Sequence, residues 1–182
     1  MSILVTGGAR SGKSGFAERL MESLADRALY VATGQAFDGE MQERIALHVR
    51  QREESGYAWE TAEEPLDLPG LLDSLPGDTA VLVDCLTLWL SNVLLAVEAD
   101  SERKLLVERE IARLEQSVAS FRGALILVTN EVGDGIVPEY ALGRLYRDLA
   151  GRMNASLAYQ CSQVFLVTAG IPIELKSREY KL

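Results

Sequence analysis

The sequence predicts an α/β fold in which helices flank a mostly parallel sheet. Short runs of β-branched and apolar residues recur along the chain, and each run is continuous rather than alternating, as expected for strands that are buried on both faces. Segments with helical periodicity lie between these runs. Strands that alternate with helices are typical of a parallel sheet, whose ligands gather beyond the carboxyl ends of the strands.

Five strands are expected from these runs, in chain order at residues 3–7, 28–33, 79–85, 124–131 and 164–170. Helices are expected over about residues 14–24 and 39–53. A proline- and glycine-rich stretch, residues 68–78, is interpreted as a helix hairpin or loop. The clearest helix covers residues 101–121, where apolar residues recur at helical spacing and charged residues lie on the other side.

Polar side chains follow the carboxyl end of every expected strand. They comprise Thr6 to Ser14, Thr33, Gln35, Asp84, Thr129 to Glu131 and Thr168. Because the carboxyl ends of parallel strands meet at one edge of a sheet, these residues are the place to look for a ligand site.

Composition and charge narrow the class of protein. With 182 residues and 48% hydrophobic content, the chain is large enough for one domain over residues 1–182. A net charge of −9 argues against general attraction to nucleic acid or anionic membrane. No apolar run approaches the roughly 20 residues of a membrane span, and no secretory leader is recognisable. We therefore expect a cytoplasmic protein without nucleic-acid partner or membrane insertion.

The first glycine-rich stretch, LVTGGARSGKSGF at residues 4–16, carries the firmest functional signal. Gly7, Gly12, Lys13 and Ser14 fit the pattern G-x-x-x-x-G-K-[ST] between an expected strand and an expected helix. The glycines allow consecutive backbone N–H groups to turn inward around an anion, Lys13 reaches the β- and γ-phosphates, and Ser14 ligates Mg²⁺. The competing interpretation, a glycine-rich turn with an incidental lysine, does not explain this strand-loop-helix context.

Asp84 closes the apolar run AVLVD, residues 80–84. A carboxylate at this position would hold Mg²⁺ opposite Ser14. The alternative is a helix N-cap ahead of the stretch CLTLWLSNVLL, because aspartate at a strand-helix junction often caps the helix.

Two absences indicate the type of phosphate chemistry. The chain has no Asn-Lys dipeptide, whereas guanine-specific switch GTPases usually read the base with Asn-Lys-x-Asp. It is also small, with the phosphate-binding loop at its start, whereas motor and transporter ATPases normally carry coupling domains. A small-molecule kinase or nucleotidyl transferase is therefore favoured.

The only histidine, His48, lies in the expected helix at residues 39–53, with Arg44 and Arg52 one turn to either side. A neutral imidazole is a competent nucleophile, and the arginines would stabilise charge on a transferred phosphoryl or nucleotidyl group. Spacing alone equally allows a half-buried histidine on the stripe Met41, Ile45, His48.

Several motifs, taken together, are similar to one enzyme family. They are ILVTGGARSGKS, YVAT, EMQERIALHVRQR, WETAEEP, VLVDCLTLWLSNVL and LVTNEVGDGIVPE followed by GRLYRDLAGRMNASLA, in order from residue 3 to about 170. They closely resemble the bifunctional adenosylcobinamide kinase/adenosylcobinamide-phosphate guanylyltransferase of cobalamin biosynthesis. The phosphate-binding loop alone is generic, whereas its combination with TNEVGDGIVPE and the single histidine is specific.

The resemblance implies a RecA-like P-loop NTPase that forms a homotrimer and catalyses two steps. The first phosphorylates the aminopropanol hydroxyl of adenosylcobinamide with a nucleoside triphosphate, ATP or GTP. The second transfers GMP from GTP to that phosphate and releases pyrophosphate, with Mg²⁺ as cofactor. In the family the transfer passes through a guanylyl-histidine, and the family's histidine matches His48.

The resemblance also implies the nucleotide contacts. They are Gly7, Gly8, Ala9, Arg10, Ser11, Gly12, Lys13, Ser14, Ala32, Thr33, Gly34, Val49, Arg50, Gln51, Arg52, Glu63 and Asp84. The segment between His48 and Glu63 is a few residues longer than in some relatives, which makes Glu60 the alternative to Glu63. We choose Glu63 because it lies in the TAE motif.

Three questions stay open at this stage. Asn130 and Glu131 either orient a reacting group at the rim of the site or fix their own loop. The arginines at residues 144, 147 and 152 either form ion pairs or face the anionic ligand. The other candidate functions are a single-activity kinase, in which His48→Ala keeps all activity, and a nucleotide-sensing domain, which binds nucleotide without turnover.

Overall fold

The computed structural model describes residues 1–35, 50, 52 and 54–181. Its centre is a seven-stranded sheet in the order β3-β2-β4-β5-β1-β6-β7. The strands are β1 (Ser2–Thr6), β2 (Arg27–Ala32), β3 (Ala58–Glu63), β4 (Val81–Asp84), β5 (Leu125–Val128), β6 (Gln163–Thr168) and β7 (Ile171–Glu174). All neighbouring pairs are parallel except β6 and β7.

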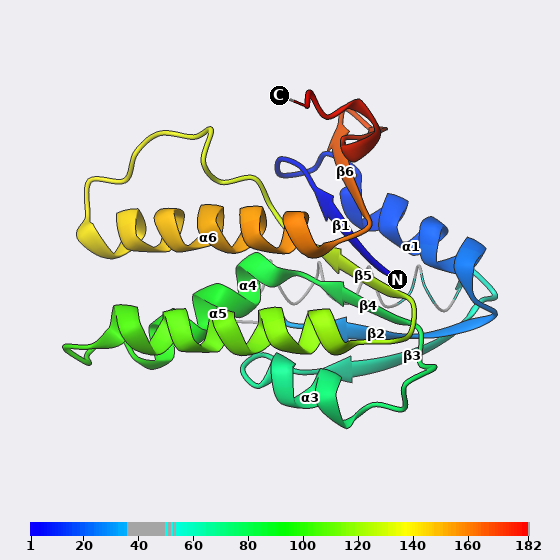
Figure 1. Ribbon diagram of the computed structural model, residues 1–182, viewed down its shortest axis with the longest axis horizontal. Helices are drawn as coiled ribbons and strands as arrows, with labels where there is room; N and C mark the ends of the chain where they lie inside the picture. The colour runs from blue at the N-terminus through cyan, green and yellow to red at the C-terminus, as the bar shows by residue number, and fades with distance from the viewer. Residues whose placement is uncertain (36–49, 51, 53, 182) are drawn as a thin grey trace.

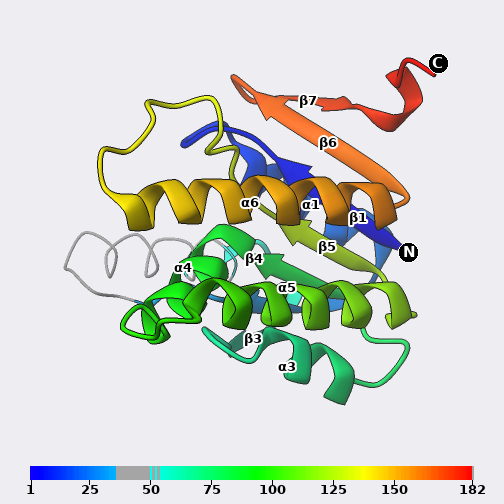
Figure 2. The ribbon, with the colours of Figure 1, turned by 60° about the vertical axis from the view of Figure 1, so that its left-hand side comes forward.

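Helices cover both faces of this sheet (Figures 1 and 2). The helices are α1 (Lys13–Leu24), α3 (Leu68–Ser74), α4 (Leu86–Ala96), α5 (Arg103–Ser120), α6 (Ala141–Gln160) and the short 3₁₀ turn η1 (Lys176–Arg178). The buried apolar residues of α3, α4, α5 and α6 form one core with one face of the sheet, and those of α1 form a second core with the other face. The predicted α/β architecture is confirmed.

All five strands expected from the sequence are present, and the structure adds two at the sheet edges. β3, with the sequence AWETAE, is largely exposed, and it lacks the continuous apolar run that marks the inner strands. β7 has the sequence IPIE, and its proline is tolerated because the strand lies at an edge. Burial on both faces is thus the property that made the inner strands recognisable.

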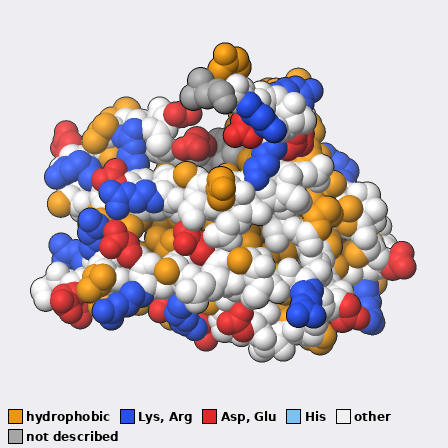
Figure 3. Space-filling model, in the orientation of Figure 1, with side chains coloured by type: hydrophobic (Ala, Val, Ile, Leu, Met, Phe, Trp, Pro, Cys, Tyr) orange, Lys and Arg blue, Asp and Glu red, His pale blue; other side chains and the backbone are white. Residues whose placement is uncertain are grey.

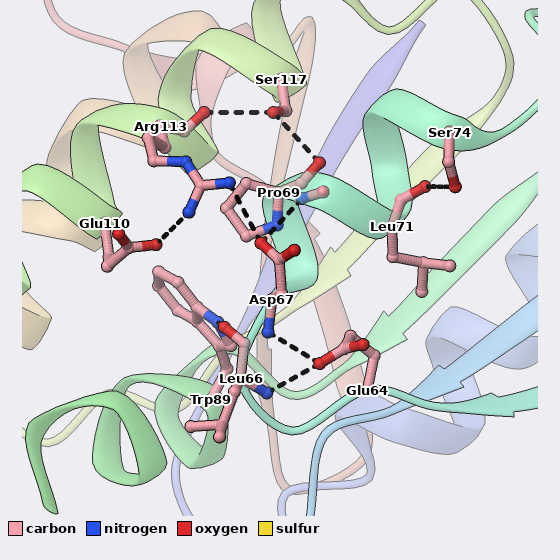
Figure 4. A network of polar contacts seen from close by, with 11 residues as sticks. Glu64, Leu66, Asp67, Pro69, Leu71, Ser74, Trp89, Glu110, Arg113 and Ser117 are labelled. Atoms are coloured by element: carbon pink, nitrogen blue, oxygen red, sulfur yellow. Dashed lines mark hydrogen bonds and ion pairs between the residues drawn. The ribbon is translucent and has the colours of Figure 1, made fainter. Parts of the chain in front are cut away.

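The expected helices at residues 14–24 and 101–121 correspond to α1 and α5. The proline- and glycine-rich stretch contains α3, which Asp67 caps by accepting a hydrogen bond from the Gly70 backbone N–H. Figure 4 shows how Arg113 and Ser117 of α5 reach this segment. Most of the helix expected over residues 39–53 lies outside the described residues.

The register of the sheet places the ends of the strands in one row. Asp84 of β4 pairs with Ala32 of β2 on one side and with Val128 of β5 on the other. Val128 pairs in turn with Val5 of β1. The glycine-rich loop after Thr6 and the segments that follow Ala32, Asp84 and Val128 therefore leave the sheet at the same edge.

Charged side chains of both signs are interspersed on the face shown in Figure 3. Within the residues that the structure describes, no helix is long and apolar enough to cross a membrane. Cys85 and Cys161 are both buried and free, with no disulfide between them.

Candidate functional site

The glycine-rich loop connects β1 to α1 through a conformation that requires its glycines. Gly12 has φ +91° and occupies the N-cap of α1, in the left-handed region that glycine adopts without strain. At Gly7 an added Cβ would lie 2.4 Å from the carbonyl oxygen of Val167. No side chain caps α1, and its first turn has no acidic residue. The N–H groups at the start of this helix are therefore left for an anion.

Lys13 is the first residue of α1, and only 6% of it is exposed. Its Nζ donates a hydrogen bond to the carbonyl oxygen of Gly8, at 3.1 Å, which bends the side chain back over the loop. Its position at the N-terminus of α1, inside the glycine-rich loop, suits a phosphate group.

Two buried hydroxyls close to the loop have no hydrogen-bond partner among the residues that the structure describes. They are Thr6 Oγ1, at the end of β1, and Ser11 Oγ, inside the loop. Buried polar atoms are almost always hydrogen-bonded in folded proteins. A ligand in the loop would give such groups a partner, which is an independent indication that the loop is built to hold one.

The turn between β6 and β7 packs against the glycine-rich loop and is hydrogen-bonded to it. The backbone N–H of Gly170 donates to the carbonyl oxygen of Ser11 at 2.9 Å, and Gly12 lies close to Gly170. Ala169 and Gly170 both have positive φ, which makes this turn tight. Sequence reasoning missed this contact, because the only local signal was the glycine that ends the last predicted strand.

Asp84 ends β4 with its carboxylate held by a tyrosine. Oδ2 accepts a hydrogen bond from the Tyr30 hydroxyl at 3.1 Å. The N-cap of α4 is Cys85, and no side chain caps that helix. The interpretation of Asp84 as a helix cap is therefore wrong. Burial raises the pKa of the neighbouring Cys85 thiol, the charge of Asp84 adds to this, and the charge of Lys13 opposes it.

Thr33 fixes the backbone that follows Asp84. Its hydroxyl donates to the carbonyl oxygen of Cys85 at 2.7 Å and accepts from the Cys85 N–H at 2.9 Å. The Thr33 N–H donates to the carbonyl oxygen of Asp84, and Asn92 of α4 donates to the carbonyl oxygen of Thr33. The ends of β2 and β4 are thereby joined at the site.

A buried charged cluster lies next to Asp84. Arg52, only 5% exposed, places its guanidinium carbon 3.6 Å from the centroid of the Tyr30 ring. Its Nη1 lies 3.7 Å from Oε1 of Glu18 on α1, and neither atom has a hydrogen-bond partner within the described part of the chain. Burial raises the pKa of Glu18 to about 7, against the lowering effect of Arg52. Burial also raises the pKa of Tyr30, and the charge of Asp84 adds to this.

The polar residues after β5 and the arginines of α6 contact other protein groups. Asn130 donates to Thr87 Oγ1 at 2.6 Å, and Glu131 accepts from the N–H of Gly133. Arg144 and Arg147 of α6 donate to carbonyl oxygens of the same loop, those of Pro138, Glu139 and Gly133. Arg152 instead forms an ion pair with Glu108 on α5. Glu131 therefore fixes its own loop, whereas Asn130 joins the loop to α4, and the expected ion pair is present at Arg152.

The structure brings part of the predicted site together. Gly7 to Ser14, Ala32, Thr33, Gly34 and Asp84 lie along the same edge of the sheet. Glu63 ends β3 and pairs with Ala32, one strand further out. Arg50 is exposed, and Arg52 is buried against Tyr30. His48, Val49 and Gln51 lie outside the described residues.

The donor set suits a cation that binds mainly through phosphate and water. Among the residues that the structure describes, no group of three or more His, Cys, Asp and Glu side chains could hold a metal. Ser14 lies on α1 and Asp84 on β4, and these two elements pack against each other. One hydroxyl and one carboxylate are what Mg²⁺ typically takes from a protein when substrate phosphates complete its shell.

The strand, glycine-rich loop and helix, with a buried lysine at the helix start, define a P-loop nucleotide-binding protein. Residues 3–175 match the family described as "Cobinamide kinase / cobinamide phosphate guanyltransferase", and the chain belongs to this family. The resemblance inferred from the motifs is therefore confirmed, and with it the class of enzyme.

Curated relatives match over nearly their whole length. The chain is 45% identical over 177 residues to "Bifunctional adenosylcobalamin biosynthesis protein CobP" of Pseudomonas aeruginosa, covering 97% of this chain and 98% of the relative. It is 42% identical over 185 residues to "Bifunctional adenosylcobalamin biosynthesis protein CobU" of Salmonella typhimurium, covering 97% and 100%. The Escherichia coli protein of the same name is 39% identical with the same coverage.

A solved structure with a similar fold is a prototypical ATPase from the type III secretion system of pathogenic bacteria. Its TM-score is 0.55 at 11% sequence identity, and the match covers 100% of this chain and 58% of that one. This likeness concerns the fold alone, a mostly parallel sheet flanked by helices, as the sequence predicts.

Proposed function

We propose that the protein phosphorylates the aminopropanol hydroxyl of adenosylcobinamide with ATP or GTP and then transfers GMP from GTP to the new phosphate. The product of the second step is adenosylcobinamide-GDP, and pyrophosphate leaves. The observation that carries this proposal is the buried Lys13 beside an uncapped helix N-terminus and the orphaned Ser11 hydroxyl, in a chain of the cobinamide kinase family. Such a loop binds the triphosphate that both steps consume.

In the first step, the loop N–H groups and Lys13 hold the β- and γ-phosphates while the cobinamide hydroxyl attacks the γ-phosphorus. The bond between the γ-phosphorus and the bridging oxygen breaks, and the nucleoside diphosphate leaves. Ser14 and Asp84 would hold Mg²⁺, which when bound neutralises charge between the phosphates. Lys13 supplies charge stabilisation from the protein itself, in a site where a fixed donor acts without reorganisation.

In the second step, we propose that a nitrogen of His48 attacks the α-phosphorus of GTP and that pyrophosphate leaves. A phosphate oxygen of adenosylcobinamide phosphate then attacks the guanylyl phosphorus, and the histidine leaves. This route replaces one encounter between two anions by two encounters in which a neutral imidazole attacks or departs. The lysine and loop that bind the triphosphate serve both steps.

The experiment that tests this proposal uses GTP labelled at the α-phosphate. The protein is incubated with it, denatured, and examined for acid-labile, alkali-stable label, with His48→Ala as the matched control. We expect label on the wild type alone, and adenosylcobinamide phosphate should discharge it. Absence of label from a wild-type protein that binds GTP would leave the single-activity kinase. Absence of any turnover with adenosylcobinamide would leave a nucleotide-sensing domain.

We also propose that residues 1–182 form one domain and that three copies associate. The single sheet from β1 to β7 supports the first statement, and exposed apolar residues support association: Ile136, Val137 and Tyr140 in one loop, and Ile171 and Ile173 on β7. Size-exclusion chromatography with light scattering should give about three times the 19.9 kDa chain mass. A mass near that of one chain would contradict the trimer.

A further inference from the structure

The contacts around Tyr30 carry an inference about how the proposed metal carboxylate is held. Tyr30 lies on β2, and only 5% of it is exposed. β2 is the neighbour of β4 in the sheet, and the Tyr30 hydroxyl donates a hydrogen bond to Asp84 Oδ2 on that strand. This hydrogen bond restricts the rotation of the carboxylate and so fixes the direction in which its oxygens can meet a cation or its water.

The tyrosine ring is itself held by a charged side chain. The Arg52 guanidinium lies over the ring, with 3.6 Å between its carbon and the ring centroid, and Trp59 of β3 packs against the ring edge-on at 6.0 Å between centroids. A guanidinium over an aromatic face is attractive, more so when it is removed from water. Rotation of the Tyr30 ring would have to displace both neighbours.

Glu18 of α1 supplies the opposite charge to Arg52, at 3.7 Å. α1 is the helix that begins with Lys13. The chain of contacts from Glu18 through Arg52 and Tyr30 to Asp84 therefore links the two elements that would share the cation, α1 and β4.

We propose that Tyr30 is a positioning residue for Asp84, and that Arg52 and Glu18 keep the Tyr30 hydroxyl on this carboxylate. The proposal rests on the proposed function only in that Asp84 serves a Mg²⁺-nucleotide. Partners that orient a ligating carboxylate typically change metal affinity about 10- to 100-fold when they are removed. The role differs from the nucleotide contact that the sequence predicts for Arg52, because the guanidinium acts here through tyrosine and carboxylate.

The test measures binding rather than turnover. The probe is a GTP analogue with a methylene group between the α- and β-phosphorus, which cannot release pyrophosphate. Its dissociation constant is measured against MgCl₂ concentration and in EDTA, and Mn²⁺ binding to the protein-analogue complex is followed by electron paramagnetic resonance. Tyr30→Phe deletes the hydroxyl and keeps the ring. We expect about a 10-fold higher Mg²⁺ or Mn²⁺ requirement and unchanged affinity for the analogue in EDTA.

The matched control is Tyr57→Phe. The Tyr57 hydroxyl donates to the carbonyl oxygen of Ala25 at 2.8 Å, and its ring packs against Trp59 at 4.9 Å between centroids, so this variant loses a comparable hydrogen bond away from Asp84. Its metal requirement should equal that of the wild type. Equal metal requirements in Tyr30→Phe and Tyr57→Phe would overturn the proposal.

Two further variants test the chain of contacts. Arg52→Lys keeps the charge but loses the planar group that stacks on the ring, and it should raise the metal requirement less than Tyr30→Phe does. In Asp84→Asn, adding Tyr30→Phe should have no further effect on metal binding, since the group that the hydroxyl positions has been neutralised. Additive effects of the two changes would contradict positioning. Because the readout needs no histidine chemistry, its failure is distinct from failure of guanylyl transfer.

Discussion

Two charged clusters in this molecule differ in burial and in how well their charges are paired. Between α3 and α5, Arg113 donates hydrogen bonds to Asp67 at 3.1 Å and to Glu110 at 2.7 Å. Asp67 also accepts a hydrogen bond from the backbone N–H of Gly70 in α3 (Figure 4). This exposed cluster has side chains 49% exposed at Arg113 and 61% at Asp67. Beside Asp84, Arg52 and Glu18 are largely buried and lie 3.7 Å apart, and each has a polar atom without a hydrogen bond to any residue that the structure describes.

This difference in burial and pairing distinguishes charges that join two helices at the surface from charges that contribute to a functional site. The exposed cluster forms good hydrogen bonds, and its effect on stability is small because water competes for each charge. The buried cluster is costly, since removing charges from water is repaid only by close and complete pairing. A fold keeps such a cluster where it contributes to function, and this one lies beside the proposed Mg²⁺ carboxylate.

The largest effect should come from removing the buried charge at the phosphate loop. Lys13→Met keeps the length of the side chain and deletes its ammonium group. We expect kcat/KM of both the kinase and the guanylyltransferase reaction to fall at least 10²-fold, because a fixed donor to the transferred phosphates is lost. Arg113→Met, the same kind of change in the exposed cluster, should leave both values within about twofold of wild type. Retained activity in Lys13→Met would contradict the assigned role of the loop.

The pH dependence of stability should reveal the buried Glu18. Its pKa is raised to about 7 in the folded protein from 4.5, so the protonated form favours the native state. Its contribution is fully present below pH 4.5 and is lost as pH rises through 7. Glu18→Gln stays neutral, so the melting temperature of the wild type should fall relative to that of the variant between pH 5 and pH 8. Parallel profiles for the two proteins would show that Arg52 compensates the buried carboxylate completely.

The sequence predicted the inner sheet and the phosphate loop because each leaves a local signal. Continuous apolar runs mark strands that are buried on both faces, and the spacing of Gly7, Gly12 and Lys13 is set by the shape of a bound phosphate. The Tyr30 contact with Asp84 and the Gly170 contact with Ser11 join residues that are distant in the chain. No periodicity encodes such pairs, because they depend on strand order and register.

The prediction for Asp84 shows the same limit in another form. A strand followed by a helix allows both a cap and a metal carboxylate at the junction. The choice depended on the conformation of Asp84 and Cys85, and the structure places Cys85 at the N-cap. A local pattern can thus list the options for a residue, and here the three-dimensional arrangement excludes one of them, the helix cap.

The partly exposed carboxylate of Glu174, on the edge strand β7, should change stability with pH in the direction opposite to Glu18. Hydrogen bonds from Ser177, with those from the backbone N–H groups of Val164 and Lys176, lower the pKa of Glu174 to about 2 from 4.5. Its stabilising contribution is present above pH 4.5 and is lost as pH falls through 2. The advantage of the wild type over Glu174→Gln in melting temperature should therefore shrink between pH 5 and pH 3. An advantage that grows on acidification would contradict these contacts.

The smallest effect is expected in the exposed cluster itself. Glu110 raises the pKa of Arg113, and the pairing holds α5 against the start of α3, but exposed ion pairs typically contribute about 0 to 1 kcal/mol. Arg113→Ala should lower the free energy of unfolding by no more than about 1 kcal/mol, and added salt should reduce the difference because it screens the pair. Urea unfolding at low and high NaCl measures both quantities. A loss of several kcal/mol in the free energy of unfolding that persists in high salt would contradict this expectation. It would show that water does not weaken the exposed ion pairs as the comparison with the buried cluster assumes.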